Sequence, residues 1–177
     1  MWNQDLYQKA IAFAGHAHRN QVVPSKEYNY VVHIANVAAE VARAMFEENL
    51  GDCDLAIQCA LLHDVLEDTD TIQDQLEAEF GKKVMEGVLA LTKNSELDKK
   101  DRMADSLFRI KKQGREIACV KMADRITNLQ NPPTHWTREK IATYLAEAEM
   151  IHAELGYASK YLSNRLKQKI EEYRGYC

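Results

Sequence analysis

The sequence predicts an all-α protein, an orthogonal bundle of about eight or nine helices. Apolar residues recur at helical spacing along most of the chain, no alternating strand pattern appears, and only 7 Gly and 3 Pro interrupt its 177 residues. A chain of this length is expected to form a single domain over residues 1–177, with enough apolar side chains for a substantial core.

The composition narrows the class of function. A net charge of −4 gives no general attraction to nucleic acid or to an anionic membrane, so a phosphate-bearing ligand must be held by local cations. No apolar run approaches the ~20 residues that span a bilayer. The 4 cysteines form no C-x-x-C pair and no secretory leader precedes them, which favours reduced thiols in a cytoplasmic protein.

The elements of the first half follow from periodicity and from helix-breaking residues. Residues 3–19 predict a first helix, residues 20–29 an irregular loop, and residues 30–48 a second helix. After a turn at Gly51, Asp52 is expected to cap a helix that holds residues 56–66.

The second half continues the same pattern. Residues 71–80 predict a short acidic helix that Gly81 ends, and apolar residues at 84, 88 and 91 predict the next one. A polar loop over 93–99 precedes a helix over 100–113. Residues 116–129 begin almost entirely apolar, which indicates a central buried helix before Pro132 and Pro133. Thr137 is expected to cap the next helix, and a last helix follows Gly156.

One apolar stretch, residues 59–69, carries an unusual number of ionisable side chains. It reads CALLHDVLEDT, so that His63, Asp64, Glu67 and Asp68 stand among residues expected to be buried. Burying such groups is costly unless they pair, hydrogen-bond or bind a metal. The stretch therefore indicates a functional site, with an ion-pair cluster or a solvent-facing helix end as the alternatives.

Two more polar residues, His33 and Asp124, lie in apolar surroundings on other predicted helices. With His63 and Asp64 they offer two imidazoles and two carboxylates, a set that suits Mn²⁺, Fe²⁺ or another divalent metal of intermediate hardness. No cysteine belongs to the set, which argues against a structural zinc site. Taken alone, His33 is better explained as a core or capping histidine, and Asp124 could be the ion-pair partner of a neighbouring cation.

Helical spacing places two further acids beside this set. Glu67 is four residues after His63 and Asp68 is four after Asp64, so they share a helix face. There they would orient or deprotonate a water molecule at the metal. The alternative is that they end the helix in solvent, but acids are unfavourable at a helix C-terminus unless something positive offsets them.

Asn128 and Arg125 lie on the same predicted helix as Asp124. Asn128 is four residues after Asp124, where its amide would bind a base, a sugar or the acids, or else cap the helix end. Arg125 would neutralise a carboxylate or a phosphate, or else form a surface ion pair. The sequence favours neither reading for either residue.

These residues resemble a known family. The order of His33, His63-Asp64 and Asp124 is similar to that of the HD-domain metal-dependent phosphohydrolases. The closer resemblance is to the hydrolase domain of the RelA/SpoT family, which degrades the guanosine alarmones (p)ppGpp. It rests on the segments AGHAHRNQ (14–21), YVVH (30–33), ALLHDVLEDT (60–69), FG (80–81), LTK (91–93) and KMADRITNL (121–129). Because the resemblance covers nearly the whole chain, the protein resembles the stand-alone small alarmone hydrolases.

The resemblance implies a fold and a set of roles. The fold would be that of the HD domain, and the reaction would remove a 3′-diphosphate as pyrophosphate. The implied roles are one Mn²⁺ bound by His33, His63, Asp64 and Asp124, water activation by Glu67 and Asp68, nucleoside contacts by Asn128 and Tyr144, and phosphate contacts by Lys93 and Arg125.

One loop departs from the family pattern. Members usually carry an Arg-Lys pair after the glutamine of the first loop, whereas here Gln21 is followed by Val22 and Val23, and the nearest cation is Lys26. A loop without that pair either accepts a less charged ligand or recruits another cation, such as Lys26, Lys93, Lys99 or Arg102.

Three hypotheses follow. The first is a Mn²⁺-dependent phosphohydrolase acting on a nucleotide, with (p)ppGpp as the leading substrate. The second is an HD phosphatase for another nucleotide or a nicotinamide dinucleotide phosphate. The third is a module that binds nucleotide without turnover, or a helical scaffold. The oligomeric state does not follow from the sequence.

Overall fold

The computed structural model describes residues 2–177, and the regular structure in that range is helical. An isolated bridge between Val22 and Asn29 is its one β-type pairing. The elements are α1 (Gln4–Ala17), α2 (Val31–Glu47), α3 (Cys53–Leu62), α4 (Val65–Asp68), α5 (Gln73–Phe80), α6 (Lys82–Leu91), α7 (Arg102–Ile110), α8 (Arg115–Asn128), α9 (Arg138–Leu155), η1 (Gly156–Ala158), α10 (Lys160–Tyr173) and η2 (Arg174–Tyr176). The all-α prediction is confirmed. The described residues hold one α-helix more than the eight or nine predicted, because the helix predicted over 56–66 is divided into α3 and α4.

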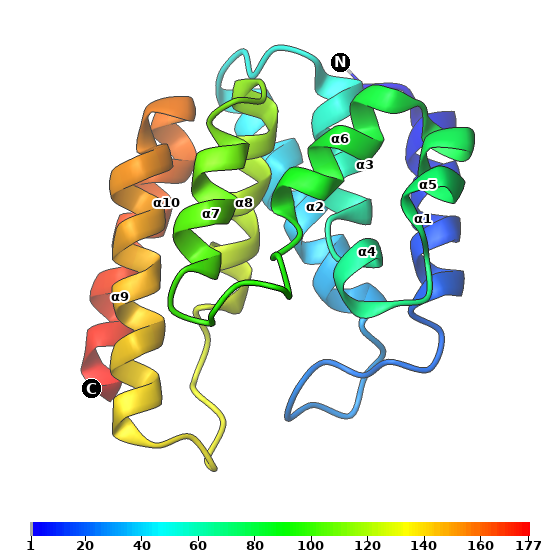
Figure 1. Cartoon of the computed structure of the whole chain (residues 1–177). Helices are drawn as coiled ribbons and strands as arrows, with labels where there is room; N and C mark the ends of the chain where they lie inside the picture. Colours follow the sequence, from blue (N-terminus) through cyan, green and yellow to red (C-terminus); the bar gives the residue numbers. More distant parts are fainter. Residues whose placement is uncertain (1) are drawn as a thin grey trace.

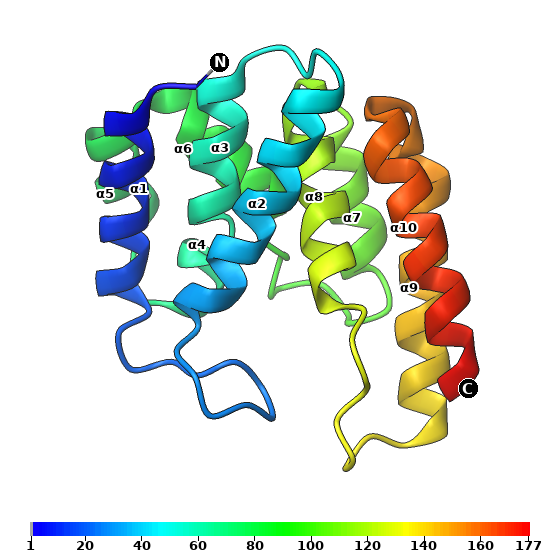
Figure 2. The ribbon, with the colours of Figure 1, turned by 180° about the vertical axis from the view of Figure 1, so that it is seen from behind.

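Helices α2, α3 and α8 form the centre of the molecule. Each of these three helices packs on the other two. Helices α1 and α5 lie toward one side of the molecule, and α9 and α10 lie next to each other at the opposite side (Figures 1 and 2). The central position of α3 and α8 follows from their composition, because residues 56–62 of α3 and 117–126 of α8 are all buried. None of the helices in residues 2–177 is both long enough and apolar enough to cross a membrane.

The residues that the sequence predicts as helix caps lie at helix ends. Asp52 accepts a hydrogen bond from the backbone N–H of Leu55 at 3.0 Å, and Thr137 accepts one from Lys140 at 3.2 Å. Gly81, with φ of +83°, separates α5 from α6 in a backbone conformation that favours glycine. The predicted caps and the predicted stop are therefore confirmed.

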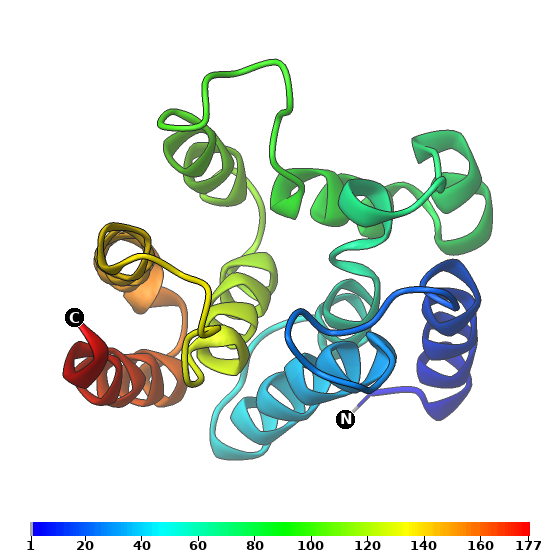
Figure 3. The same cartoon turned by 90° about the horizontal axis from the view of Figure 1, so that it is seen from below.

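Two loops extend from the same end of the bundle. The loop after α1, residues 18–30, and the loop after α8, residues 129–137, both leave at the lower end in Figure 1, and Figure 3 looks onto that end. The first turn of α2, the end of α3 and the last turns of α8 lie there as well. This end therefore brings together the polar residues that the sequence singles out.

Candidate metal centre and adjoining cavity

The helix predicted over residues 56–66 breaks between Leu62 and Val65, so that part of the prediction is wrong. Asp64 has φ of −105° and ψ of −1°, which turns the chain before α4 begins. As a result, His63 and Asp64 face one centre, with His63 Nε2 2.9 Å from Asp64 Oδ2. Adjacent residues of a continuous helix diverge by about 100° and do not meet in this way. Asp68 keeps its expected four-residue relation to Asp64, because its backbone N–H donates to the carbonyl of Asp64 at 2.9 Å, and the N–H of Glu67 bonds the same carbonyl at 3.2 Å.

Three side chains offer donor atoms to a common point. The donor atoms of His33, His63 and Asp64 all lie within 4.8 Å of one another, and both histidines are buried. The two Nε2 atoms are 3.3 Å apart, although they come from the first turn of α2 and the end of α3. The structure thus brings together three of the four predicted metal ligands.

The hydrogen bond of His63 shows that these donors fit a cation. Its Nδ1 lies 2.8 Å from the carbonyl oxygen of Ala60, so Nδ1 donates, and whenever the ring is neutral the lone pair of Nε2 points toward the carboxylate of Asp64. A lone pair and a carboxylate oxygen at 2.9 Å repel unless a proton or a cation lies between them. Although burial opposes it, the charge of Asp64 raises the pKa of His63 to about 9. A carbonyl behind a histidine ring is also the usual support of a metal-binding imidazole.

Asp124 lies next to this set and has partners of its own. Its Oδ1 is 3.5 Å from His33 Nε2 and 3.8 Å from His63 Nε2. Asn128 donates to Oδ1 at 2.6 Å, and buried Lys121 lies 3.3 Å from Oδ2. Although burial opposes it, Lys121 and the two histidines hold the pKa of Asp124 well below its usual range. Asp124 is therefore both a candidate fourth ligand and the ion-pair partner that the sequence offered as an alternative.

Tyr30 fixes the other carboxylate. Its hydroxyl donates to Asp64 Oδ2 at 2.5 Å, and its ring packs beside that of His33 with centroids 5.0 Å apart. Burial, with the nearby charge of Asp64, raises the pKa of Tyr30 far above its ordinary value, so the hydroxyl keeps its proton. Tyr30 thus holds the carboxylate oxygen of Asp64 that also faces His63.

Glu67 is held by one lysine through two contacts. Lys93 Nζ lies 2.9 Å from Glu67 Oε1, and the backbone N–H of Lys93 donates to Oε2 at 2.9 Å. Lys93 is the positive group that this acidic helix end was expected to need. The structure therefore places Lys93 against Glu67, and Lys93 does not line the neighbouring cavity.

Asp68 lies on the same short helix and is held from the first loop. Gln21 Nε2 donates to Asp68 Oδ2 at 3.0 Å. Burial and the charge of Asp64 raise the pKa of Asp68, and the bond from Gln21 lowers it in part. Asp68 can therefore accept a proton more readily than an isolated aspartate.

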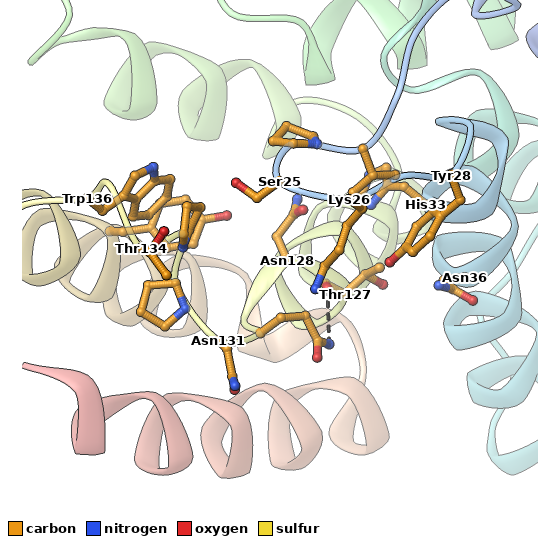
Figure 4. Close-up of a pocket in the computed structure, with 16 residues that line it drawn as sticks. Ser25, Lys26, Tyr28, His33, Asn36, Thr127, Asn128, Asn131, Thr134 and Trp136 are labelled. Atoms are coloured by element: carbon orange, nitrogen blue, oxygen red, sulfur yellow. Dashed lines mark hydrogen bonds between the residues drawn. The ribbon is translucent and has the colours of Figure 1, made fainter.

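A cavity of about 620 Å³ adjoins the metal-ligand candidates, which is a usual size for a small-molecule site. Figure 4 shows residues of the two lower loops facing each other across it, with the end of α8 between them. Its walls carry amide and hydroxyl groups and an aromatic pair, Trp136 and Tyr144, with ring centroids 5.2 Å apart. The cavity reaches the candidate ligands through His33 and through Asn128, the partner of Asp124.

The predicted substrate residues divide into two groups. Lys26, Asn128 and Tyr144 line the cavity. Arg125 does not, because its side chain is buried, pairs with Glu147 at 3.0 Å and lies 4.0 Å from the centroid of the Tyr144 ring. Arg125 is thus neither at the cavity surface nor a surface ion pair, and it supports the aromatic wall from behind.

Three residues at the site are absent from the predicted site residues: Gln21 and Tyr30, which stand in segments that carry the family resemblance, and Trp136. Gln21 and Tyr30 reach acids 47 and 34 residues away through side-chain bonds, which no local pattern announces. Trp136 follows the Pro132-Pro133 break and lines the cavity. A large aromatic residue in a polar loop is the only feature of the sequence that indicates this role.

Comparison with known proteins gives a family model, relatives of similar length and a shared fold. A family model described as HD domain matches residues 10–160. Guanosine-3′,5′-bis(diphosphate) 3′-pyrophosphohydrolase MESH1 of Mus musculus is 31% identical over 169 residues, which cover 93% of this chain and 92% of the mouse protein. A guanosine-3′,5′-bis(diphosphate) 3′-pyrophosphohydrolase of Aquifex aeolicus is 30% identical over 94% of this chain but only 23% of its own length.

A solved structure of a metazoan ortholog of SpoT, reported to hydrolyse ppGpp and to play a role in starvation responses, superposes with a TM-score of 0.85. It is 26% identical, and the match covers 100% of this chain and 99% of that one. The family model, the relatives of similar length and the shared fold lead to one conclusion: this chain belongs to the HD domain family.

Proposed function

We propose that the chain is a metal-dependent phosphohydrolase that removes the 3′-diphosphate of guanosine-3′,5′-bis(diphosphate) and releases pyrophosphate. The observation that carries the proposal is the set of His33, His63 and Asp64 at the edge of a nucleotide-sized cavity. The relatives that match over almost their full length are named for this reaction. We further propose that residues 1–177 act as one domain in the cytoplasm, which the buried thiols Cys59 and Cys119 support.

The proposed ion is Mn²⁺, held by His33, His63 and Asp64 with Asp124 as the fourth ligand. Two imidazoles and two carboxylates are a mixed donor set that suits Mn²⁺ or Fe²⁺. When bound, such an ion stabilises the negative charge that grows on the phosphoryl oxygens and makes a nearby water molecule more acidic.

The chain's own acids carry the proton in this proposal. A water oxygen forms a bond to the phosphorus attached to the 3′ oxygen, the bond between that oxygen and phosphorus breaks, and pyrophosphate leaves. Asp68 takes the proton of the attacking water, because Gln21 holds its Oδ2 and leaves Oδ1 without a hydrogen-bond partner in residues 2–177. Glu67, fixed by Lys93, orients the water beside it. The 3′ oxygen leaves with a proton from solvent.

The cavity side of the site would bind the nucleoside and the remaining phosphates. Asn128 and Tyr144 face the cavity, where an amide and an aromatic ring suit a base or a sugar. Lys26 is the only lysine or arginine among the lining residues in the part of the chain that the structure describes. We therefore assign the phosphate contact to Lys26 and no longer to Arg125, whose guanidinium faces Glu147.

The same observation favours a second candidate function. With one cation in place of an Arg-Lys pair, the cavity suits a nucleotide that brings less charge into it, such as another phosphorylated nucleotide or a nicotinamide dinucleotide phosphate. A module that binds nucleotide without turnover is the third alternative, and it conflicts with the presence of both acids beside the ligand set.

One experiment separates these functions. The protein is incubated with Mn²⁺ and a nucleotide panel, and phosphate and pyrophosphate are measured separately. Pyrophosphate from guanosine-3′,5′-bis(diphosphate) supports the first function, and release only from another nucleotide moves the proposal to the second. Asp64→Ala should lose metal binding, whereas Glu67→Ala should keep the metal and lose turnover. A fully active Glu67→Ala protein would refute the role given to that acid.

A further inference from the structure

The contact of Gln21 with Asp68 continues into the stem of the first loop, where Gln21 is held by its backbone and by His18. The backbone N–H of Gln21 donates to the carbonyl of His18 at 2.9 Å, and the carbonyl of Gln21 accepts from Tyr30 N–H at 2.9 Å. The backbone of Gln21 is therefore fixed on both sides. Its side-chain amide lies between Asp68 and His18.

The direction of each hydrogen bond from His18 through Gln21 to Asp68 follows from the charge of Asp68. An ionised Asp68 only accepts, so the Gln21 NH₂ group must face it, as the 3.0 Å contact from Nε2 shows. The Oε1 of Gln21 then faces His18 Nδ1, 2.6 Å away, and Nδ1 must donate. His18 Nε2 is buried without a hydrogen-bond partner in residues 2–177, which suits the tautomer in which Nε2 carries no proton.

His18 is itself held in one orientation. It is 1% exposed, and its ring packs against that of Tyr30 with centroids 5.0 Å apart. A buried ring fixed on one face by an aromatic neighbour has little freedom to turn. The hydrogen-bond donor that selects the orientation of the Gln21 amide is thus built into the packing of the stem.

We propose that Gln21 is a positioning residue for Asp68, and that His18 fixes the Gln21 amide so that its NH₂ group, and not its oxygen, faces the carboxylate. The inference rests on the catalytic role given to Asp68 in the proposed function. Its consequence is that His18 and Gln21 act on turnover without touching nucleotide or metal. Loss of the arrangement should lower kcat and leave KM and metal binding nearly unchanged.

Two matched pairs of variants test the chain of contacts. Gln21→Met keeps the length of the side chain and removes the donor, and Gln168→Met removes the similar bond between Gln168 and Glu172 far from the site. His18→Asn keeps an N–H donor close to the position of Nδ1, whereas His18→Leu removes it. We expect Gln21→Met and His18→Leu to lower kcat about 10- to 100-fold, as misplaced catalytic groups do. His18→Asn and Gln168→Met should stay close to wild type.

Three readouts accompany the rates, measured on the full chain with Mn²⁺ and guanosine-3′,5′-bis(diphosphate). Mn²⁺ titration should give wild-type values for Gln21→Met, and thermal unfolding should show that the variant is folded at the assay temperature. In ¹⁵N NMR spectra of the protein without nucleotide, the side-chain amide signal of Gln21 should move in His18→Leu and remain in place in His18→Asn. The NMR result tests the contact even if the substrate proves to be a different nucleotide.

The outcomes separate this inference from the proposed function. A wild-type protein that releases no pyrophosphate overturns the function, and an unmoved Gln21 amide signal in His18→Leu overturns the inference. If wild type is active, a Gln21→Met protein with kcat within twofold of it also overturns the inference. So does a Gln21→Met protein that loses metal binding or is unfolded at the assay temperature, because that would be a structural role. Should His18→Leu fail to fold, Gln21→Met decides alone.

Discussion

Replacing Tyr30 by Phe removes the hydroxyl that bonds a candidate metal ligand, Asp64, and keeps the buried ring. The hydroxyl donates to Asp64 Oδ2 at 2.5 Å, and a hydrogen bond to a charged group contributes roughly 1.5–3 kcal/mol. If that energy serves to hold the carboxylate in its ligating orientation, its loss weakens metal binding by roughly 10- to 150-fold, since 1.4 kcal/mol is about tenfold. Groups behind metal ligands typically contribute about 10- to 100-fold, so the two scales agree.

The assay is a Mn²⁺ titration of Tyr30→Phe followed by electron paramagnetic resonance of the free ion. Tyr157→Phe is the matched control, because Tyr157 is 64% exposed and lies outside the cavity. We expect the control to bind as wild type does. If Tyr30→Phe binds Mn²⁺ with the same affinity as the control, Tyr30 does not orient Asp64, and the assignment of Asp64 as a supported ligand is refuted.

Three further predictions concern charged residues that are not candidate metal ligands. Lys26→Met should raise KM about tenfold without changing Tm, because it removes the cation that lines the cavity; an unchanged KM would contradict this. Arg125→Met should instead destabilise the fold by roughly 1–3 kcal/mol in denaturant unfolding, since it breaks the pair with Glu147; an unchanged midpoint would show that the pair contributes nothing. Although burial opposes it, the hydrogen bond from Ser159 holds the pKa of Glu48 below its ordinary value. The Tm difference between wild type and Glu48→Gln should therefore be largest above about pH 4.5 and shrink as the pH falls below that value. A difference that does not vary with pH would refute that role.

The sequence predicts the candidate centre because ionisable side chains in apolar runs are rare. His63 and Asp64 stand after seven buried residues, and Asp124 stands in a helix of which ten consecutive residues are buried. Such positions need partners, and the partners of Asp124 are indeed at hand in Asn128 and Lys121. Helical periodicity likewise predicts the all-α fold and nearly every helix.

The break at Asp64 could not be predicted in the same way. Residues 59–66 satisfy the helical pattern throughout, and the chain turns there because side-chain bonds formed in the folded state outweigh local helix propensity. The position of Arg125 could not be predicted either, because a cation in an apolar helix can neutralise either a bound phosphate or a carboxylate of the protein. Only the position of Glu147, on the next helix, decides between them.

The two parts of the loop between α1 and α2 have different roles at the site. Its stem, at Gln21 and Tyr30, is bonded to Asp68 and Asp64, while residues 23–26 at its tip form part of the cavity wall. Substitutions at the tip can therefore change which ligand fits without disturbing the reacting groups. A change of selectivity in this protein therefore requires the exchange of only a few consecutive residues, which leaves the bonds to Asp64 and Asp68 intact.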